Sequence, residues 1–580
     1  RSVTTGRRMI IVLDDAASAA QVRMLLPGPG PGRPGPGRPS LVVVTSRWRL
    51  AGLAMDGARF LELGPLTEPE ALDLLDRVIG ADRTAAEPGE RHALARLCHG
   101  LPLALCIIAA RLAAHPRWPL SRLAGELASE RSRLHAMSLD GDVSVRAAFD
   151  IAYQALGPET KRAYRMTSFI PGPDFDVELA AATLSDRAAA DQAGEGQDRA
   201  HVRDALDTLA DASLLTEADD ARYRFHDLAR LHAQERADSI PGERPAALAR
   251  SISAYLDRAV KADFAVSPGR WRLNPMYDRQ RPSSPASAPV TEAADAADTT
   301  ALDSLDAWLP GFLAAVEAAH RAGLHRETWQ LCESLWSVFV LRKHFSLWIS
   351  AHHTGIAAAE ACGDTRALAR MHVQLGIALL TLHRYDEARQ HFVPALELAR
   401  RDGHLPGQAA ALEQIGLADL SEDAPDAAIT RFAEARDINR QLGVPRGVAL
   451  AARRVGEAQR DLGRYDDALR ELAEARRIFA SFPDAYMEMR TLTSLAQTLL
   501  LAGRAVDAVE PLTAALATAT RLRSRYEQAR VARYLGVAAR QADDMSTARR
   551  HLSDALAGFE ATGAPDAEEV RRELAALDTG

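Results

Sequence analysis

Lysine is almost absent from this chain of 580 residues: Lys161, Lys261 and Lys343 are its only lysines, and arginine supplies the other 67 of its 70 basic residues. The GxxxxGK(S/T) loop that cradles nucleotide phosphates requires a glycine directly before its lysine. None of the three lysines follows a glycine. The 580 residues therefore contain no phosphate-binding loop of this kind.

Other absences exclude further classes of protein. The longest apolar run, residues 101–110, is too short to span a bilayer. Neither HExxH nor GxSxG occurs, so the sequence gives no support to a zinc peptidase or a serine hydrolase. The first residues lack the plan of a signal peptide, and four scattered cysteines do not make a disulfide framework. We therefore expect a cytoplasmic protein with no membrane partner.

A forty-residue repeat fills the C-terminal half of the chain. Three features recur in register: a small residue at positions 376, 416, 456, 496 and 536, an alanine at 388, 428, 468, 508 and 548, and a large apolar residue at 392, 432, 472, 512 and 552. This spacing predicts two helices in each unit, because the small residue lets them approach and the large one fills the next gap. A divergent unit precedes the others, with Leu335, Trp348 and Ala358 in register. We expect six units.

These positions, together with Gly463-Arg464-Tyr465 at the turn between two helices, resemble the tetratricopeptide (TPR) repeat in a long-helix form. The resemblance implies a concave groove that is lined by the first helix of each unit and binds a protein or peptide. The residues predicted to face this groove are Arg370, Glu413, Arg453, Arg460, Arg490, Arg530, Arg533 and Arg540. Seven arginines against one glutamate favour an acidic ligand. The alternative is a solvated helix face in an arginine-rich protein.

The N-terminal half begins with two short apolar runs, residues 9–13 and 41–44. Continuous apolar runs of this kind are typical of strands in a parallel sheet that is covered on both faces. The Pro/Gly tract at residues 27–39 separates them and predicts a surface loop.

Helical patterns follow, including residues 68–80 after the capping Thr67, and residues 92–114. Residues 214–225 predict a hairpin with an acidic turn at 219–220. The stretch 265–300, which includes a run rich in Pro, Ser and Ala at 281–289, predicts a solvated linker.

The ends of the two predicted strands carry polar residues. Asp14 and Asp15 follow the first strand, and Arg47 lies just after the second. A strand that ends in two carboxylates can hold Mg²⁺ and polarise water in a nucleotide site. Strands also often end in aspartate for structural reasons alone, and that reading stays open. Two further motifs follow along the chain, GLPLA at residues 100–104 and Phe225-His226-Asp227.

In this order the motifs resemble NB-ARC, the nucleotide switch of the STAND ATPases, in the actinobacterial branch that includes large SARP-type regulators of antibiotic production. The resemblance covers residues 1–237. The roles it implies are these: Asp14 orients Mg²⁺ through water, Asp15 is the general base, Arg47 senses the γ-phosphate, Gly100 and Pro102 belong to the GLPLA motif whose proline packs on adenine, His226 contacts the β-phosphate of ADP, and Asp227 holds the domains closed.

The missing phosphate-binding loop is expected to lie upstream of Arg1. This chain alone is therefore predicted neither to bind ADP or ATP tightly nor to hydrolyse ATP, so that ATPase activity belongs at most to a full-length parent. In that parent, a ligand in the TPR array is expected to loosen the packing around His226 and release ADP. The ATP-bound molecules then self-assemble or activate transcription.

Two alternatives belong to other classes of protein. One is a TPR scaffold that works without nucleotide. The other is a regulator that binds DNA through a winged helix predicted at residues 139–238. Lys161 is the only lysine between residues 143 and 238, and acidic residues are interspersed there, which counts against direct DNA binding. DNA contact is expected instead through a domain before Arg1.

The predicted fold is a multidomain, mostly α protein with a partial α/β domain of the P-loop type. Its predicted parts are the end of the nucleotide domain (1–64), a helical domain with GLPLA (65–138), a winged helix (139–238), a helix with a linker (239–305) and the TPR-like solenoid (306–580).

Overall fold

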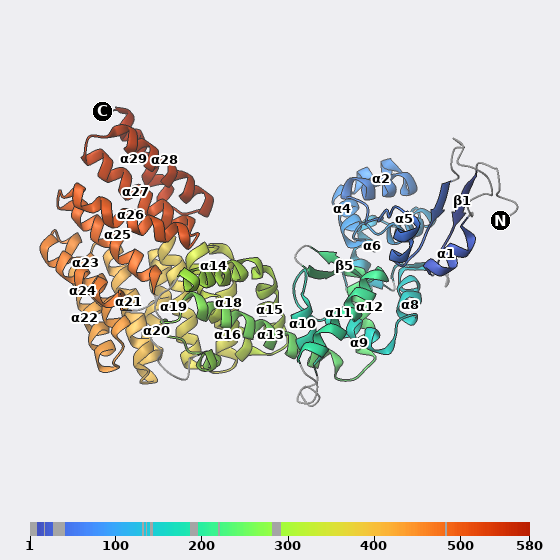
Figure 1. Ribbon diagram of the computed structural model, residues 1–580, viewed down its shortest axis with the longest axis horizontal. Coiled ribbons are helices and arrows are strands. Elements are labelled where there is room, and N and C mark those ends of the chain that lie inside the picture. Colours follow the sequence, from blue (N-terminus) through green and yellow to red (C-terminus); the bar gives the residue numbers. More distant parts are fainter. Residues whose placement is uncertain are drawn as a thin grey trace. The chain divides into compact units, whose positions relative to one another are not determined.

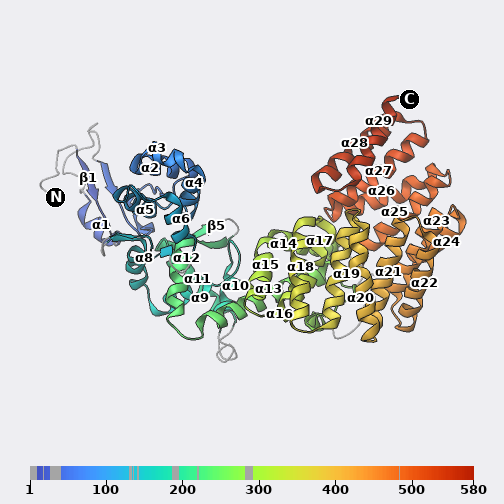
Figure 2. The same ribbon diagram turned by 180° about the vertical axis from the view of Figure 1, so that it is seen from behind.

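The structure is a computed structural model, and it is mostly helical with a few short strands, as predicted (Figures 1 and 2). It describes residues 9–16, 18–26, 41–129, 133–134, 136–139, 143–185, 195–218, 221–280, 292–481 and 484–579. The predicted loop 27–39, the turn 219–220 and the run 281–289 lie outside the described residues. The chain forms two compact units, Arg1–Ser251 and Ile252–Gly580. None of the helices in the described part of the chain combines the length and hydrophobicity that crossing a membrane requires.

The first unit begins with a two-stranded parallel sheet of β1 (Ile10–Leu13) and β2 (Leu41–Val44). Side chains of α1 (Ala19–Leu25) and of the short helix η1 (Ala51–Asp56) pack against one face. On the other face Ile10, Val12 and Leu41 are 71%, 61% and 57% exposed. The prediction that this sheet is covered on both faces is therefore wrong for its described part.

Five helices follow: α2 (Glu68–Ile79), α3 (Ala81–Ala86), α4 (Pro88–Leu97), α5 (Pro102–Ala114) and α6 (Leu120–Ala128). Thr67 caps α2 as predicted, in a capping box with Glu70. The predicted helical segment 92–114 is interrupted, because His99 and Gly100 adopt positive φ angles of 50° and 69° and Pro102 starts a new helix. A Cβ atom on Gly100 would collide with the carbonyl oxygen of Leu66, so this turn requires glycine.

The rest of the first unit combines helices with short hairpins: β3 (Ser138–Leu139), β4 (Val143–Ser144), α8 (Val145–Gln154), α9 (Pro158–Thr167), α10 (Val177–Leu184), α11 (Glu195–Asp211), β5 (Leu215–Ala218), β6 (Arg222–Phe225) and α12 (Asp227–Asp238). The predicted hairpin is present, since β5 and β6 are antiparallel with Leu215 opposite Phe225. Helices α9, α10 and α11 precede this hairpin in the chain, and the winged helix stays a prediction.

The prediction of a solvated linker is wrong for the described residues after α13 (Glu243–Val266). Asp263 near the end of α13 is fully buried and accepts hydrogen bonds from Arg270 (2.8 Å), Arg272 (2.9 Å), Tyr277 (2.8 Å) and Ser337 (2.6 Å). A buried carboxylate needs such partners. Residues 267–280, which include η3 (Pro275–Gln280), therefore fold back onto α13 and the helices of the second unit.

The second unit contains the predicted array. Its helices are α14 (Glu292–Ala307), α15 (Leu309–Arg321), α16 (His325–Ser334), α17 (Trp336–Arg342), α18 (Phe345–Ala361), α19 (Thr365–Thr381), α20 (Tyr385–Arg401), α21 (Leu405–Ser421), α22 (Pro425–Gln441), α23 (Pro445–Asp461), α24 (Tyr465–Phe479), α25 (Ala485–Leu501), α26 (Ala505–Arg521), α27 (Arg525–Gln541), α28 (Met545–Thr562) and α29 (Asp566–Thr579). Figure 1 shows them following one another in chain order, from green through yellow to red. The first helix of the divergent unit is in two pieces, because Leu335 separates α16 from α17.

The small and large residues of the repeat lie directly against each other, as predicted. A Cβ atom on Gly376 of α19 would collide with the ring of Phe392 on α20, and Gly416 has the same relation to Phe432. In later repeats Gly456 faces Leu472 and Gly536 faces Leu552. The forty-residue period therefore arises from one close helix–helix contact that is made again in each unit.

The beginning of the array is also joined to its later part. Arg342 donates hydrogen bonds to the carbonyl oxygens of Leu522 (2.9 Å) and Arg523 (2.7 Å), and Ser524 donates to the carbonyl oxygen of Leu341 (2.8 Å). These partners lie 180 to 183 residues apart in the chain. We refer to this contact as the clasp. It links α17 to the turn between α26 and α27.

Candidate functional site

The polar residues at the ends of β1 and β2 lie together, as a shared site requires. Arg47 donates to both carboxylate oxygens of Asp15, at 2.9 Å and 3.1 Å. The hydroxyl of Thr45 donates to Asp14 and accepts from the backbone N–H of Asp15 at 2.9 Å. Asp15 has a φ of 53°, a conformation that aspartate adopts more readily than most residues.

We refer to Asp14, Asp15, Thr45 and Arg47 as the strand-end cluster. It suits a cation that keeps bound water better than a cation whose ligands all come from the protein. Two carboxylates and a hydroxyl match Mg²⁺ that keeps several waters and binds through phosphates. Asp15 engages Nε and Nη2 of Arg47, and its Nη1 is not part of that pair. The nucleotide roles of Asp14, Asp15 and Arg47 stay predictions. Among the described residues, no group of three His, Cys, Asp or Glu side chains has the geometry of a metal site.

A second cluster joins the turn before α5 to the start of α12. His99 Nδ1 lies 2.7 Å from Asp227 Oδ2, and His226 Nε2 lies 3.3 Å from the carbonyl oxygen of His99. His226 also caps α12, because its Nδ1 accepts the backbone N–H of Leu228 at 3.3 Å. The hydrogen bond from His99 lowers the pKa of Asp227, and burial lowers the pKa of His226. We refer to His99, His226 and Asp227 as the histidine joint.

The GLPLA motif supports this joint through its backbone. Gly100 provides the turn, and Pro102 is the first residue of α5, with an exposed ring. Their predicted contacts with nucleotide stay predictions. Within the described residues, no hydrogen bond or ion pair connects the histidine joint to Asp14, Asp15 or Arg47. The structure therefore forms two separate clusters from the predicted nucleotide residues.

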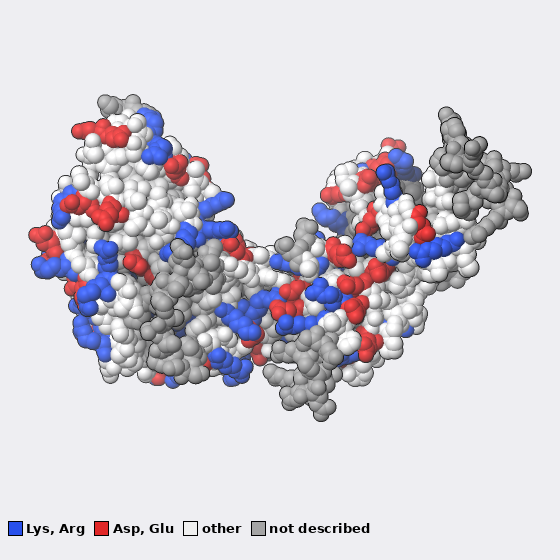
Figure 3. Space-filling model, in the orientation of Figure 1, with Lys and Arg blue, Asp and Glu red and all other residues white. Residues whose placement is uncertain are grey.

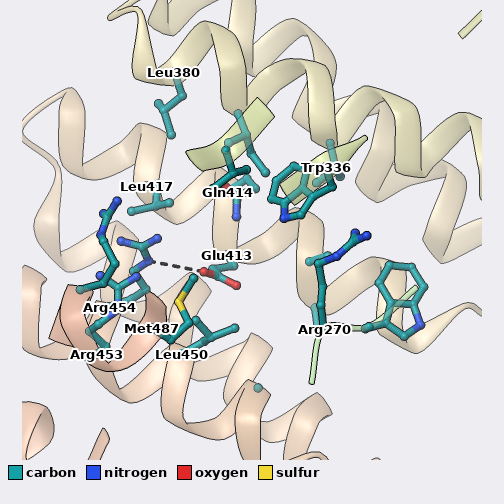
Figure 4. A pocket seen from close by; sticks show the side chains of 18 of the residues that line it. Arg270, Trp336, Leu380, Glu413, Gln414, Leu417, Leu450, Arg453, Arg454 and Met487 are labelled. Atoms are coloured by element: carbon teal, nitrogen blue, oxygen red, sulfur yellow. Dashed lines mark hydrogen bonds and ion pairs between the residues drawn. The ribbon is translucent and has the colours of Figure 1, made fainter. Parts of the chain in front are cut away.

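The inner face of the array encloses a cavity of about 450 Å³ (Figure 4). As predicted, most of its wall comes from the first helices of the repeats: α19, α21, α23, α25 and α27. Trp336 of α17, residues 269–271, Tyr385 of α20 and Asn439 of α22 also line it. Its apolar part includes Leu380, Leu417, Leu450 and Met487.

Six of the seven arginines predicted to face the groove are ion-paired. Their partners are Glu333 for Arg370 (3.1 Å), Glu457 for Arg453 (2.6 Å), Asp461 for Arg460 (2.8 Å), Glu527 for Arg490 (3.3 Å) and Arg530 (2.5 Å), and Glu569 and Glu573 for Arg533 (2.6 Å each). Carboxylates that the prediction did not include therefore neutralise part of the predicted positive charge, and the acidic ligand stays a prediction. A solvated helix face is wrong, since Arg453 is only 1% exposed.

Three members of the predicted set, Arg460, Arg533 and Arg540, are not among the residues that line the cavity. Arg533 shows why. Its guanidinium turns to Glu569 and Glu573, because α29 follows the last repeat and presents these carboxylates to it. Arg370, Arg453, Arg490 and Arg530 do line the cavity.

The glutamate partners were missed from the sequence, although helical spacing gives a signal for two of them. Glu457 lies four residues after Arg453, and Glu527 lies three residues before Arg530. These spacings place both members of a pair on the same helix face. Glu333 has no such signal, since it pairs with Arg370 across 37 residues.

The structure adds nothing in favour of direct DNA binding. On the face that Figure 3 shows, acidic and basic side chains are interspersed over α10 to α12. Lys161, the lysine of this region, donates to the carbonyl oxygen of Gln154 at 3.0 Å and contacts the ring of Tyr153. DNA-binding proteins usually gather basic residues on one surface.

Comparison with known proteins gives two kinds of match. The family model of the tetratricopeptide repeat matches residues 367–441 and 447–521. The regulatory protein AfsR of Streptomyces griseus is 32% identical over 455 residues, which cover 71% of this chain and 44% of that protein. AfsR of Streptomyces coelicolor is 35% identical over 409 residues, which cover 69% of this chain and 38% of that protein. The chain thus spans less than half the length of these relatives.

Among solved structures, a STAND protein with a tetratricopeptide-repeat sensor from Pyrococcus horikoshii is similar over 93% of this chain and 73% of that chain, with 16% identity and a TM-score of 0.38. The chain is therefore related to the AfsR regulatory proteins over most of its length, and its C-terminal part is an array of tetratricopeptide repeats.

Proposed function

We propose that this chain is the sensing part of a cytoplasmic, STAND-type transcriptional regulator, in which the repeat array controls an ADP/ATP switch. The observation that carries the proposal is the histidine joint. It ties the turn before GLPLA to the start of α12 through groups that a nucleotide phosphate can engage, since an imidazole can donate to phosphate oxygen. A ligand in the array would weaken this joint and let ADP leave.

Helix α13 offers a physical route for this control. At its start Glu243 accepts two hydrogen bonds from Arg165, both 2.8 Å long, within the first unit. Near its end Asp263 is buried in the second unit. Glu243 and Asp263 lie on the same helix. A rearrangement around Asp263 can therefore shift this helix and change the contact between Glu243 and Arg165. This coupling is part of the proposal.

We expect the 580-residue chain by itself to bind fluorescent ADP with a dissociation constant weaker than about 1 µM. The loop whose backbone N–H groups and lysine supply most of the phosphate binding is not among its residues. Titration of the purified chain with and without Mg²⁺ measures this. Submicromolar affinity would show that the strand-end cluster and the histidine joint suffice, and would contradict the expectation.

The proposal itself is tested in the longest native protein that contains this chain, by the rate at which it releases labelled ADP. Asp227→Asn removes the charge that pairs with His99, and we expect release to become about fivefold faster, because a partly exposed pair contributes about 1 kcal/mol. The matched control is Asp238→Asn at the other end of α12, where the carboxylate pairs with Arg244 at 2.7 Å. Equal release rates from the two variants would favour a nucleotide-independent scaffold.

A further inference from the structure

The cavity of the array has the size of a small-molecule site. Its volume of about 450 Å³ lies within the range of about 300–1,000 Å³ that pockets for single small ligands occupy. This volume therefore suits a single small ligand.

The wall of the cavity carries both apolar and cationic side chains. Leu380, Leu417, Leu450, Met487 and Trp336 line it, and so do arginines of α23, α25 and α27. Figure 4 shows Arg453 and Arg454 beside Leu450 and Met487. A molecule that satisfies both kinds of side chain needs an apolar body and a charged or strongly polar group.

Positive charge exceeds negative charge around this cavity. Eight guanidinium groups in and behind the wall share six carboxylates: Arg270 and Arg272 pair with Asp263, Arg370 with Glu333, Arg446 with Asp484, Arg453 and Arg454 with Glu457, Arg454 also with Glu413, and Arg490 and Arg530 with Glu527. Lys343 is a ninth cation, and Asp566, which faces it, is a seventh carboxylate. The described residues therefore leave an excess of cations.

Several of these cations are also short of hydrogen-bond acceptors. The Nε atoms of Arg453, Arg490 and Arg530 are buried and have no partner among the described residues. Burial lowers the pKa of Arg453 to about 9 and that of Arg370 to about 10. A buried donor without an acceptor is costly, and an anion supplies both the acceptor and the missing charge.

We infer that the cavity inside the repeat array binds a small amphipathic anion, a molecule with one carboxylate or phosphate group and a compact apolar body. The anionic group engages Arg453, Arg490 and Arg530, and the apolar body packs on Leu417, Leu450 and Met487. This assignment deepens the proposed function, since it names the class of signal that the array would sense, but the binding itself does not depend on a nucleotide switch.

The test uses the full 580-residue chain and the fluorescent probe anilinonaphthalene sulfonate, which is itself an apolar anion. Decanoate and decyl phosphate are the competitors, and decyltrimethylammonium has the same chain length with the opposite charge. We expect both anions to displace the probe and the cation to leave it bound; whichever anion is stronger identifies the head group. Equal displacement by the cation would overturn the inference, and so would displacement only by a long acidic peptide.

Two matched pairs of variants locate the binding. Ala410→Trp fills the cavity from α21 and should abolish displaceable probe binding, whereas Ala427→Trp on the exposed face of α22 should not. Arg453→Gln should weaken decanoate about tenfold or more, as the loss of a charge-assisted hydrogen bond predicts, whereas Arg533→Gln outside the cavity should not. Circular dichroism checks that each variant is folded. Unchanged binding in folded Ala410→Trp would overturn the inference.

The two proposals fail in different ways. If decanoate binds in the cavity and ADP release from the native protein does not respond, the inference stands and the proposed switch is wrong. If Asp227→Asn accelerates ADP release but no anion binds the cavity, the switch stands and the inferred ligand class is wrong.

Discussion

Asp263→Asn should release the segment of residues 267–280 from the array and lower the free energy of unfolding of the second unit by about 3–5 kcal/mol. Burial alone would raise the pKa of Asp263, but Arg270 and Arg272 outweigh it and hold the pKa at about 2. Asparagine keeps the shape of the side chain and removes its charge. Arg270 and Arg272, which are 7% and 3% exposed, would then be buried cations without a counter-ion.

Trypsin provides the measurement, because it cleaves after arginine and both arginines are buried in the native chain. We expect cleavage after Arg270 and Arg272, followed by mass spectrometry, to become much faster in the variant. The matched control is Asp257→Asn on the same helix, where the carboxylate is 45% exposed and pairs with Lys261. If the two variants are cleaved at the same rate, the segment does not depend on Asp263.

Acidification should destabilise the array through His352, by about 3 kcal/mol between pH 6.5 and pH 4. His352 is fully buried, with Nδ1–H donating to the carbonyl oxygen of Trp348 at 2.9 Å and Nε2 lying 3.2 Å from the side-chain amide of Gln374. Burial lowers its pKa to about 4, with Arg370 and His353 as nearby cations. The unfolded chain thus takes up a proton near pH 6.5 that the folded chain does not accept until about pH 4, so the stability present above pH 6.5 is lost as the pH falls.

The quantity to compare is the slope of the free energy of unfolding against pH. Its value at one pH is not sufficient, because His352→Gln also changes packing. Urea midpoints between pH 7.5 and pH 4.5 should fall less steeply in His352→Gln than in the parent chain. His353→Gln is the matched control, since the side chain of His353 is exposed. Other histidines, such as the half-buried His391 with a pKa lowered to about 4, also contribute to the slope and do so in every variant. An unchanged slope in His352→Gln would assign the acid sensitivity to those residues.

The array could be predicted well because its period depends on local contacts that recur. The fit of Gly376 against Phe392 needs only a small residue, a large residue and a fixed separation, and all three are visible in the sequence. The inward direction of each first helix follows from the same register. Sequence therefore predicted both the helices and the wall of the cavity.

The charges of that cavity could not be predicted in the same way. The carboxylate that neutralises Arg370 is Glu333, which lies 3.1 Å away but 37 residues earlier in the chain, and local spacing does not reveal such a pair. Composition alone also misjudged the segment after α13. In the sequence its arginines and Tyr277 look like residues of a solvated linker. The structure shows that they donate hydrogen bonds to the buried Asp263.

The nucleotide residues fall between these cases. Parallel pairing of β1 and β2 brings Asp15 to Arg47 as their positions at the strand ends suggest. The contact of His226 with His99 depends on a break between α4 and α5, and the predicted helical segment 92–114 ran through this break. The sequence predicted the roles of His226 and Asp227 in the histidine joint. Only the structure shows that His99 is the third member.

The central claim, that occupancy of the array controls the nucleotide switch, has one direct test. Labelled ADP is bound to the longest native protein that contains this chain, and its release is timed for Ala410→Trp, in which an indole occupies the cavity, and for Ala427→Trp, in which the same side chain lies on the outside of the array. We predict that ADP is released faster from Ala410→Trp and not from Ala427→Trp. Identical release from both variants and the parent protein would contradict it.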